Sequence, residues 1–290
     1  MIRAIVALAA ASVLSVAHAE PVDQDGWAAR KETVKLDNGM KLAFVEFGDP
    51  KGKPVILLHG FTDTSRSWTQ ALPALAEFRV IIPDQRGHGA SGKPPCCYTV
   101  TDYAYDLKLL MDEMKIDRAA IAGHSLGSMV AMEFAGTYPD RIEKLVLAAS
   151  TGKAPARRGE WLTDGALAMQ EPIDQTGEFI NVWFSVDGAV KTPVDLNFLD
   201  HVFRATPAHV WRGVIGGLID LPVARHAGVI KAPVLILAAE KDDLFDASHL
   251  EALRGAFPAA DVIEFKGLGH NLIWEQPETT APPIAVFLRR

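Results

Sequence analysis

The stretch "AIAGHSLGSMVAMEF", residues 120–134, decides the fold of this 290-residue chain. It passes from an apolar run through Gly123 and Gly127, which flank Ser125, into apolar residues at helical spacing. Taken alone, Ser125 could be an N-cap residue that opens a helix, or a nucleophile held at a sharp turn. The surrounding sequence has to distinguish these two interpretations.

Short apolar runs alternate with helical patterns along most of the chain. Two alternating runs joined by Asp37-Asn38-Gly39 predict an N-terminal hairpin. Runs typical of strands buried on both faces follow at 53–60, 79–84, 119–125, 142–150, 232–240 and 260–267. Helical patterns lie at 100–116, with Thr101 as the expected N-cap, and at 126–139, 246–257 and 277–290, the last interrupted by Pro282 and Pro283. The alternation predicts an α/β fold with a mostly parallel central sheet flanked by helices.

Residues 152–230 break this alternation. They contain Trp161, Trp183 and Trp211 and broken helical patterns, but no run typical of a buried strand. We therefore expect a core built from residues 20–151 and 231–290, with residues 152–230 inserted as a helical cap.

The first 19 residues carry the pattern of a secretory signal peptide. Arg3 supplies a positive charge, residues 4–17 are mostly apolar, and Ala17-His18-Ala19 places small residues where a signal peptidase cleaves. The apolar run is too short for a membrane anchor, since a spanning helix needs about 20 residues. The sequence predicts cleavage after Ala19 and a secreted or periplasmic protein that keeps no stable membrane anchor.

Composition limits the classes of partner. Hydrophobic residues make up 49% of the chain and charged residues 22%, which excludes a disordered or fibrous protein. The net charge of −7 and the lack of a Lys/Arg-rich run argue against nucleic acid as a partner. We expect a small-molecule substrate, and nothing in the sequence predicts an oligomeric state.

The only two cysteines, Cys96 and Cys97, are adjacent. Neighbouring Cα atoms lie about 3.8 Å apart, whereas disulfides usually span about 4.4–6.8 Å, so a vicinal disulfide forms only as a strained ring. Such a bond could stiffen a loop or respond to redox conditions in an oxidising compartment. The alternatives are two free thiols or an intermolecular bridge. No Cys/His spacing indicates a metal site.

A nucleophilic serine requires a histidine base and a carboxylate that orients it. His270 follows the predicted strand 260–267, and Asp242 follows the predicted strand 232–240. Ser125, Asp242 and His270 would thus meet at the edge where parallel strands end, in the chain order Ser, Asp, His. Asp243 and Asp246 are the nearby alternatives for the acid. The Phe61 N–H, after the predicted strand 53–60, and the Leu126 N–H are placed to form an oxyanion hole.

Five segments in this order resemble the α/β-hydrolase fold superfamily, from about residue 31 to residue 290: "HGF", "DQRGHGASGKP", "GHSLG", "AAEKDDLF" and "GLGHNLIWEQPE". The resemblance implies that Ser125 is the nucleophile, His270 the general base and Asp242 its orienting acid, with no cofactor. It also implies the oxyanion hole of Phe61 and Leu126 and a cap at 152–230. One departure is "AAEKDD", where relatives commonly have a glycine before the turn of the acid.

The leading hypothesis is an exported serine hydrolase that cleaves an ester or lactone of a small, fairly apolar substrate. The same triad would serve an amidase, an iminopeptidase, a thioesterase, a carbon–carbon bond hydrolase or a cofactor-free perhydrolase. Dehalogenases and most epoxide hydrolases of this fold are disfavoured because they resemble a pattern with aspartate in place of Ser125. A catalytically silent binding protein is the alternative from another class, and a thiol–disulfide enzyme is weakly supported without a C-x-x-C motif.

Several other side chains have two interpretations each. Trp68, Trp183 and Trp274 could line an apolar acyl or alcohol pocket or could be ordinary packing. His59 and His88, in glycine-rich turns, are expected to hold loops, and His124 is expected to pack against the sheet.

Overall fold

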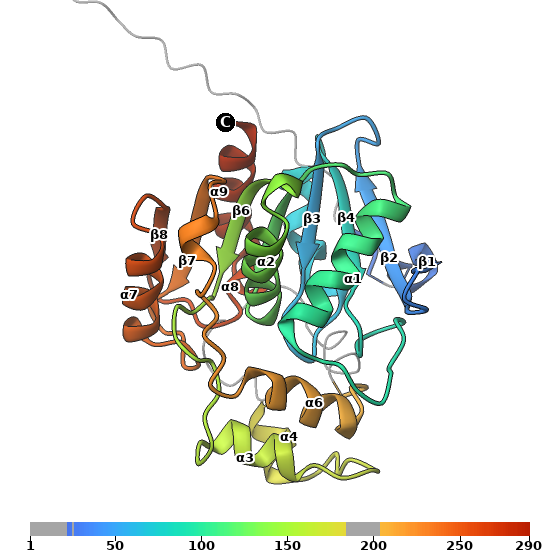
Figure 1. The fold of residues 1–290 in the computed structure, drawn as a ribbon, viewed down its shortest axis with the longest axis vertical. Coiled ribbons are helices and arrows are strands. Elements are labelled where there is room, and N and C mark those ends of the chain that lie inside the picture. The colour runs from blue at the N-terminus through green and yellow to red at the C-terminus, as the bar shows by residue number, and fades with distance from the viewer. Residues whose placement is uncertain (1–21, 25, 184–203) are drawn as a thin grey trace, which may run out of the picture.

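The computed structural model describes residues 22–24, 26–183 and 204–290 (Figure 1). Within them, one sheet has the strand order β1-β2-β4-β3-β5-β6-β7-β8. The first two strands form the predicted hairpin, β2 pairs antiparallel with β4, and the remaining pairs are parallel. The strands are β1 (Glu32–Lys35), β2 (Lys41–Gly48), β3 (Pro54–Leu58), β4 (Arg79–Asp84), β5 (Ala119–His124), β6 (Ile142–Ala148), β7 (Val234–Ala239) and β8 (Asp261–Phe265). The mostly parallel sheet predicted from the apolar runs is confirmed.

Helices cover both faces of this sheet. Successive residues of β3 alternate between two buried clusters: Val55 and Leu57 pack in one, and Ile56 and Leu58 in the other. Burial on both faces explains why this strand is apolar at nearly every position. The cluster of Ile56 is covered by α1 (Val100–Glu113), α2 (Leu126–Thr137) and α7 (Ala247–Ala256), and that of Val55 by η2 (Ser65–Leu75), α8 (Leu272–Glu275) and α9 (Pro277–Arg289). Short 3₁₀ turns are η1 (Trp27–Arg30), η3 (Pro139–Arg141) and η4 (Ala227–Val229).

The N-cap of α1 differs from the prediction. Thr99, and not Thr101, caps the helix: its hydroxyl accepts from the Asp102 N–H at 3.3 Å, and the Asp102 carboxylate accepts from the Thr99 N–H at 2.9 Å. This reciprocal capping box satisfies two amide groups at once. The Thr101 hydroxyl instead donates to Glu133 on α2 at 2.8 Å.

The expected interruption of the last helix is also wrong, because α9 runs through Pro282 and Pro283. Each proline removes one backbone N–H from the helix. The helix continues because its apolar face, which includes Ile284 and Phe287, is buried against the sheet and η2.

The chain between β6 and β7 is helical in its described parts. It contains α3 (Trp161–Ala168), α4 (Glu178–Trp183) and α6 (Ala208–Leu218), and α3 packs on α6. In Figure 1 all three helices lie together beyond one end of the parallel strands, below the sheet in this view. Part of the expected cap, residues 184–203, lies outside the described residues, as do the predicted signal peptide and its cleavage site. The function of this segment as a cap therefore stays a prediction.

In the part of the chain that the structure describes, no helix combines the length and apolar character needed to cross a membrane.

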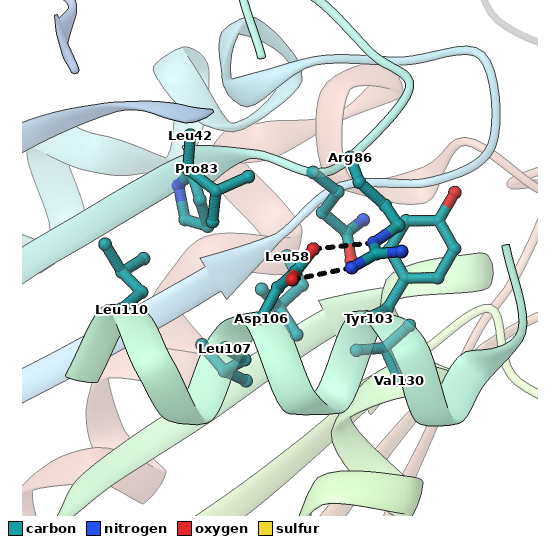
Figure 2. A pocket seen from close by; sticks show the side chains of 10 residues that line it. Leu42, Leu58, Pro83, Arg86, Tyr103, Asp106, Leu107, Leu110 and Val130 are labelled. Carbon is teal, nitrogen blue, oxygen red and sulfur yellow. Dashed lines mark hydrogen bonds and ion pairs between the residues drawn. The ribbon is translucent and has the colours of Figure 1, made fainter. Parts of the chain in front are cut away.

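A buried ion pair fixes the loop between β4 and α1. Figure 2 shows Arg86 and Asp106 bonded directly to each other, with Tyr103 beside them, in the lining of a small cavity of about 10 Å³. The guanidinium donates to the two carboxylate oxygens at 2.6 and 2.7 Å, and a third bond of 2.5 Å reaches the Cys97 carbonyl. Cys96 and Cys97, which are exposed, are bonded to each other in this loop. The ion pair thus ties the loop of the vicinal disulfide to α1.

Replacing Asp106 should strongly destabilise the protein. The Asp106→Ala variant leaves the Arg86 charge buried without its partner, which typically costs about 3–5 kcal/mol. Urea unfolding would measure the lost free energy. The matched control is Glu46→Ala, which breaks the more exposed pair of Glu46 and Arg79 (2.8 Å) and should cost less than about 1 kcal/mol. Equal losses in the two variants would contradict the assignment of the Arg86–Asp106 pair as the stabilising interaction.

Candidate active site

Ser125 occupies a strained turn between β5 and α2. Its backbone angles, φ 51° and ψ −117°, are unusual for a residue with a side chain, and such conformations cost on the order of 1–3 kcal/mol. The Ser125 N–H donates to the Ala148 carbonyl at the end of β6 (3.0 Å), and its own carbonyl accepts from the Ser128 N–H (2.9 Å) and hydroxyl (2.6 Å). Ser125 stands at the N-cap position of α2, but its side chain makes no capping hydrogen bond, so the geometry agrees with the interpretation of a serine held at a sharp turn.

The two flanking glycines are required by close backbone contacts. A Cβ on Gly123 would lie 2.2 Å from the Gly127 carbonyl oxygen, and a Cβ on Gly127 would lie 2.4 Å from the Leu58 carbonyl oxygen. The Gly127 and Leu58 carbonyl groups cannot make room for a Cβ unless α2 or β3 moves. The G-x-S-x-G spacing is therefore the condition for packing α2 against the ends of β3 and β5.

The three predicted triad residues are brought together. The distance from His270 Nε2 to Ser125 Oγ is 2.9 Å, and His270 Nδ1 lies 2.9 and 3.0 Å from the two carboxylate oxygens of Asp242. Asp242 also accepts from the Leu244 and Phe245 N–H groups, at 3.0 and 2.8 Å, which fixes its orientation. This arrangement allows a proton to pass from the serine hydroxyl to the imidazole.

Of the three candidate acids, Asp242 is the one bonded to His270. Asp246 instead caps α7, accepting from the N–H groups of Ser248 and His249 at 2.9 and 3.3 Å. Asp243 influences His270 only through its charge. The turn of Asp242 forms without the glycine that relatives commonly have before it.

Burial and charge act in opposite directions on this pair. Burial on its own lowers the pKa of His270, but the charge and hydrogen bond of Asp242 outweigh it and raise that pKa above 6.5. Burial raises the pKa of Asp242, whereas the charge of His270 and the hydrogen bond between them lower it to a net value below 3.8. Asp242 is therefore ionised at neutral pH and stabilises a proton on His270.

Two buried side chains that the sequence analysis did not assign to the site form hydrogen bonds with the backbone at His270 and Gly269. The ring of His124 donates from Nε2 to the His270 carbonyl (2.9 Å), a role more specific than the expected packing against the sheet. Burial lowers the pKa of His124 to about 3, so this ring stays neutral. The Glu275 carboxylate accepts from the Gly269 N–H at 2.8 Å. Both contacts fix the backbone at and beside His270. Neither contact could be predicted from the spacing of residues in the sequence.

The loop after β3 approaches the serine closely. A Cβ on Gly60 would lie 3.4 Å from the Ser125 Cβ and 2.9 Å from His124 Nδ1. The Gly60 carbonyl lies 2.7 Å from His59 Nδ1 and accepts from the Asp63 N–H at 3.3 Å. Because the carbonyl and N–H of one trans peptide point in opposite directions, the Phe61 N–H faces away from these partners.

His59 and His88 hold this loop, as expected. His59 Nε2 accepts from the Gln85 N–H at 2.9 Å, which leaves Nδ1 as the protonated nitrogen that donates to Gly60. His88 Nε2 accepts from the Thr62 N–H at 3.2 Å. Burial lowers the two pKa values to about 3 and about 4, respectively, so both rings are neutral connectors and do not compete with His270 as bases.

The second expected oxyanion donor, the Leu126 N–H, is the first amide of α2. The first amides of a helix have no acceptor within the helix and carry its partial positive charge. The two expected donors thus lie on two segments that are next to Ser125 in space. Phe61 is in the loop after β3, and Leu126 begins α2.

The three candidate pocket tryptophans fall into two groups. Trp68 and Trp274 are buried in the cluster of Val55, on the η2 face of the sheet, which agrees with the packing alternative for these two residues. Trp183 is half-buried and lies against Phe61, with ring centroids 5.8 Å apart. Of the three tryptophans, Trp183 is therefore the one that lies beside the loop after β3, which carries Phe61.

The described residues contain no cluster of three or more His, Cys, Asp or Glu side chains arranged to hold a metal ion. A mostly parallel sheet with a serine at the turn after β5 and a His–Asp pair on later strand ends is the arrangement typical of the α/β-hydrolase fold.

The family is identified by comparison with known proteins. A model described as the alpha/beta hydrolase fold matches residues 53–277, so the chain belongs to this family. Epoxide hydrolase A of Mycobacterium tuberculosis is 38% identical over 213 residues, which are 72% of this chain and 60% of that protein. Lipase 1 of Psychrobacter immobilis is 25% identical over 270 residues, 88% of this chain and 83% of that protein. The crystal structure of a hydrolase from Pseudomonas aeruginosa PA01 matches with a TM-score of 0.76 at 26% identity, covering 91% of this chain and 100% of that one.

These similarities confirm the predicted fold class and identify the chain as a hydrolase of the α/β-hydrolase fold.

The geometry predicts how the site histidines titrate. We expect the pKa of His270 to lie above 6.5 in the native protein and to fall below it in the Asp242→Asn variant, because burial then acts without the opposing charge. Heteronuclear NMR of the imidazole nitrogens against pH would measure both values. His59 and His124 serve as internal controls that stay neutral from about pH 5 to 8. An unchanged His270 pKa in the variant would contradict the proposed coupling.

Proposed function

We propose that this protein is an exported serine hydrolase that cleaves an ester or lactone of a small, fairly apolar substrate. The observation that carries the proposal is the continuous chain of hydrogen bonds from Ser125 Oγ through His270 to Asp242. The carboxylate orients the imidazole, and the imidazole accepts the serine proton, which is what nucleophilic attack by a hydroxyl requires.

The reaction would proceed in two halves. Ser125 Oγ attacks the substrate carbonyl while His270 takes its proton, and the resulting oxyanion accepts hydrogen bonds from the Phe61 and Leu126 amides. The tetrahedral intermediate collapses, His270 protonates the departing alcohol, and an acyl-serine forms. Water, deprotonated by His270, then releases the acid and restores the serine. Since neutral His270 is the base, turnover should fall as the pH drops through its raised pKa.

The presence of a serine at position 125 distinguishes this proposal from the epoxide hydrolysis named for one relative. Epoxide hydrolases of this fold typically resemble a pattern with aspartate at the nucleophile turn, whereas this chain has Ser125. The lipase relative, although only 25% identical, is consistent with the ester proposal. Amidase, carbon–carbon bond hydrolase and perhydrolase activities on the same triad are the alternatives, since they differ in substrate and not in catalytic groups. We also propose that the segment at 152–230 acts as the cap that selects among substrates.

Removing the nucleophile tests the proposal. Turnover of a short-chain p-nitrophenyl ester should fall by on the order of 10⁴- to 10⁶-fold in Ser125→Ala, because the remaining groups cannot form the acyl-enzyme. A fluorophosphonate probe should label the native protein at Ser125 and fail to label the variant.

Ser128→Ala is the matched control, because Ser128 lies in the same turn of α2, but its hydroxyl donates to the Ser125 carbonyl and accepts from the Ser150 hydroxyl. It should remain reactive towards the probe. A folded native protein that does not react at Ser125 would support the silent binding protein. Esterase activity of Ser125→Ala within a few-fold of the native value would exclude the serine mechanism.

Export and the state of the cysteines can be tested in one measurement. Intact-mass analysis of the protein recovered from a secreting host should give a chain that begins at Glu20 and is lighter by two hydrogen atoms than the fully reduced mass. The first shift follows from cleavage after Ala19, and the second from the bond between Cys96 and Cys97. A full-length mass would contradict the signal peptide, and alkylation of both thiols without reductant would contradict the disulfide.

A further inference from the structure

Helix α4 is bonded to the loop that carries the expected oxyanion donor. The indole Nε1–H of Trp183, the last residue of α4, donates to the hydroxyl of Thr62 at 2.9 Å. The two residues lie 121 positions apart in the chain. This contact therefore links the segment between β6 and β7 directly to the loop after β3.

The hydroxyl of Thr62 extends this contact to the backbone of Phe61. It donates its own proton to the Phe61 carbonyl at 2.7 Å, so that one hydroxyl both accepts and donates. A hydroxyl polarised by an incoming donor is a stronger donor itself. The indole, the hydroxyl and the carbonyl thus form a short chain of hydrogen bonds.

These bonds fix the peptide group that follows the expected oxyanion donor. The carbonyl of the Phe61–Thr62 peptide accepts from the Thr62 hydroxyl, and its N–H donates to His88 at 3.2 Å. Thr62 has φ 61°, a left-handed conformation that is unfavourable for a β-branched residue and requires such restraints. With the Gly60 carbonyl held by His59, the peptides on both sides of Phe61 are fixed.

Aromatic packing holds the donor of this chain in place. Trp183 lies against Phe61 and against Trp211 of α6, with ring centroids 5.8 and 5.5 Å apart, and Phe61 contacts Trp211 edge-on at 4.8 Å. The three rings connect two helices of the segment to the side chain of the residue whose amide is the expected donor. Movement of α4 would change the ring contact and the hydrogen bond together.

We propose that Trp183 and Thr62 are positioning residues that hold the Phe61 amide in place for the oxyanion, so that the docking of α4 controls the competence of the oxyanion hole. The proposal rests on the proposed serine-hydrolase function. It assigns to the inserted segment a role in the chemical step in addition to substrate selection. Because an oxyanion exists in the transition state and not in the bound ester, loss of this positioning should lower kcat more than it alters KM.

Three variants test this chain of bonds. Thr62→Val keeps the branched shape but removes the hydroxyl, and Thr62→Ser keeps the hydroxyl. Trp183→Phe keeps an aromatic ring but removes the indole N–H. We expect kcat for a p-nitrophenyl ester to fall roughly 10- to 100-fold in Thr62→Val, as for a misplaced catalytic donor, with KM within about three-fold. Thr62→Ser should restore most of kcat, and Trp183→Phe should lower kcat in the same sense.

Two further measurements separate positioning from general stability. The double variant Thr62→Val/Trp183→Phe should be no slower than Thr62→Val alone, because both changes break one chain of bonds. The affinity for an alkyl boronic acid, which binds the serine as a tetrahedral anion, should fall in parallel with kcat/KM. Trp161→Phe is the matched control: Trp161 lies on α3 of the same segment, is 49% exposed, and should be replaceable with no loss of kcat.

The outcomes distinguish this proposal from the proposed function. If ester turnover by the native protein does not depend on Ser125, the proposed function fails and this inference fails with it. If turnover depends on Ser125 but Thr62→Val or Trp183→Phe retains the native kcat, only the positioning role is overturned. If the Thr62→Val variant does not fold, the Trp183→Phe variant tests the proposal. This substitution replaces a half-buried ring by a smaller aromatic ring.

Discussion

The contact between Gly127 at the start of α2 and the Leu58 carbonyl at the end of β3 is the constraint on which the site depends. It lets the helix begin directly against the sheet, and this forces Ser125 into its strained turn. The same contact brings the loop after β3 beside the serine. One close backbone approach therefore sets the position of Ser125, of the Leu126 amide and of the loop that carries Phe61.

Around this turn, three buried histidines stay neutral and hold backbone groups, whereas a fourth, His270, is hydrogen-bonded to the Asp242 carboxylate. His59, His88 and His124 each bond a backbone group of the site, and burial keeps them neutral. His270 is also buried, but the charge and hydrogen bond of Asp242 raise its pKa above the ordinary value. Of these four imidazoles, His270 is the one that is hydrogen-bonded to a carboxylate.

Much of the fold and site could be predicted because the relevant signals are local. Apolar runs predicted each strand of the parallel sheet to within a few residues, and strand ends of a parallel sheet meet at one edge, so Ser125, Asp242 and His270 could be placed together. The N-cap of α1 and the continuation of α9 were predicted wrongly, because local residue types do not decide them. Thr99 and Thr101 are both suitable caps by type, and the packing that carries α9 through its two prolines involves distant residues.

The sequence by itself determined the fold class and predicted the glycine-flanked serine turn and the order of the candidate catalytic groups, because each depends on residue type and short spacing. The tertiary structure alone decided which tryptophans pack in the core and which one meets the oxyanion loop, since Trp68, Trp183 and Trp274 have the same local chemistry. It also decided that Asp242, and not Asp246, bonds to His270. Contacts between segments more than a hundred residues apart, such as Trp183 with Thr62, arise only when the sheet and the inserted helices pack together.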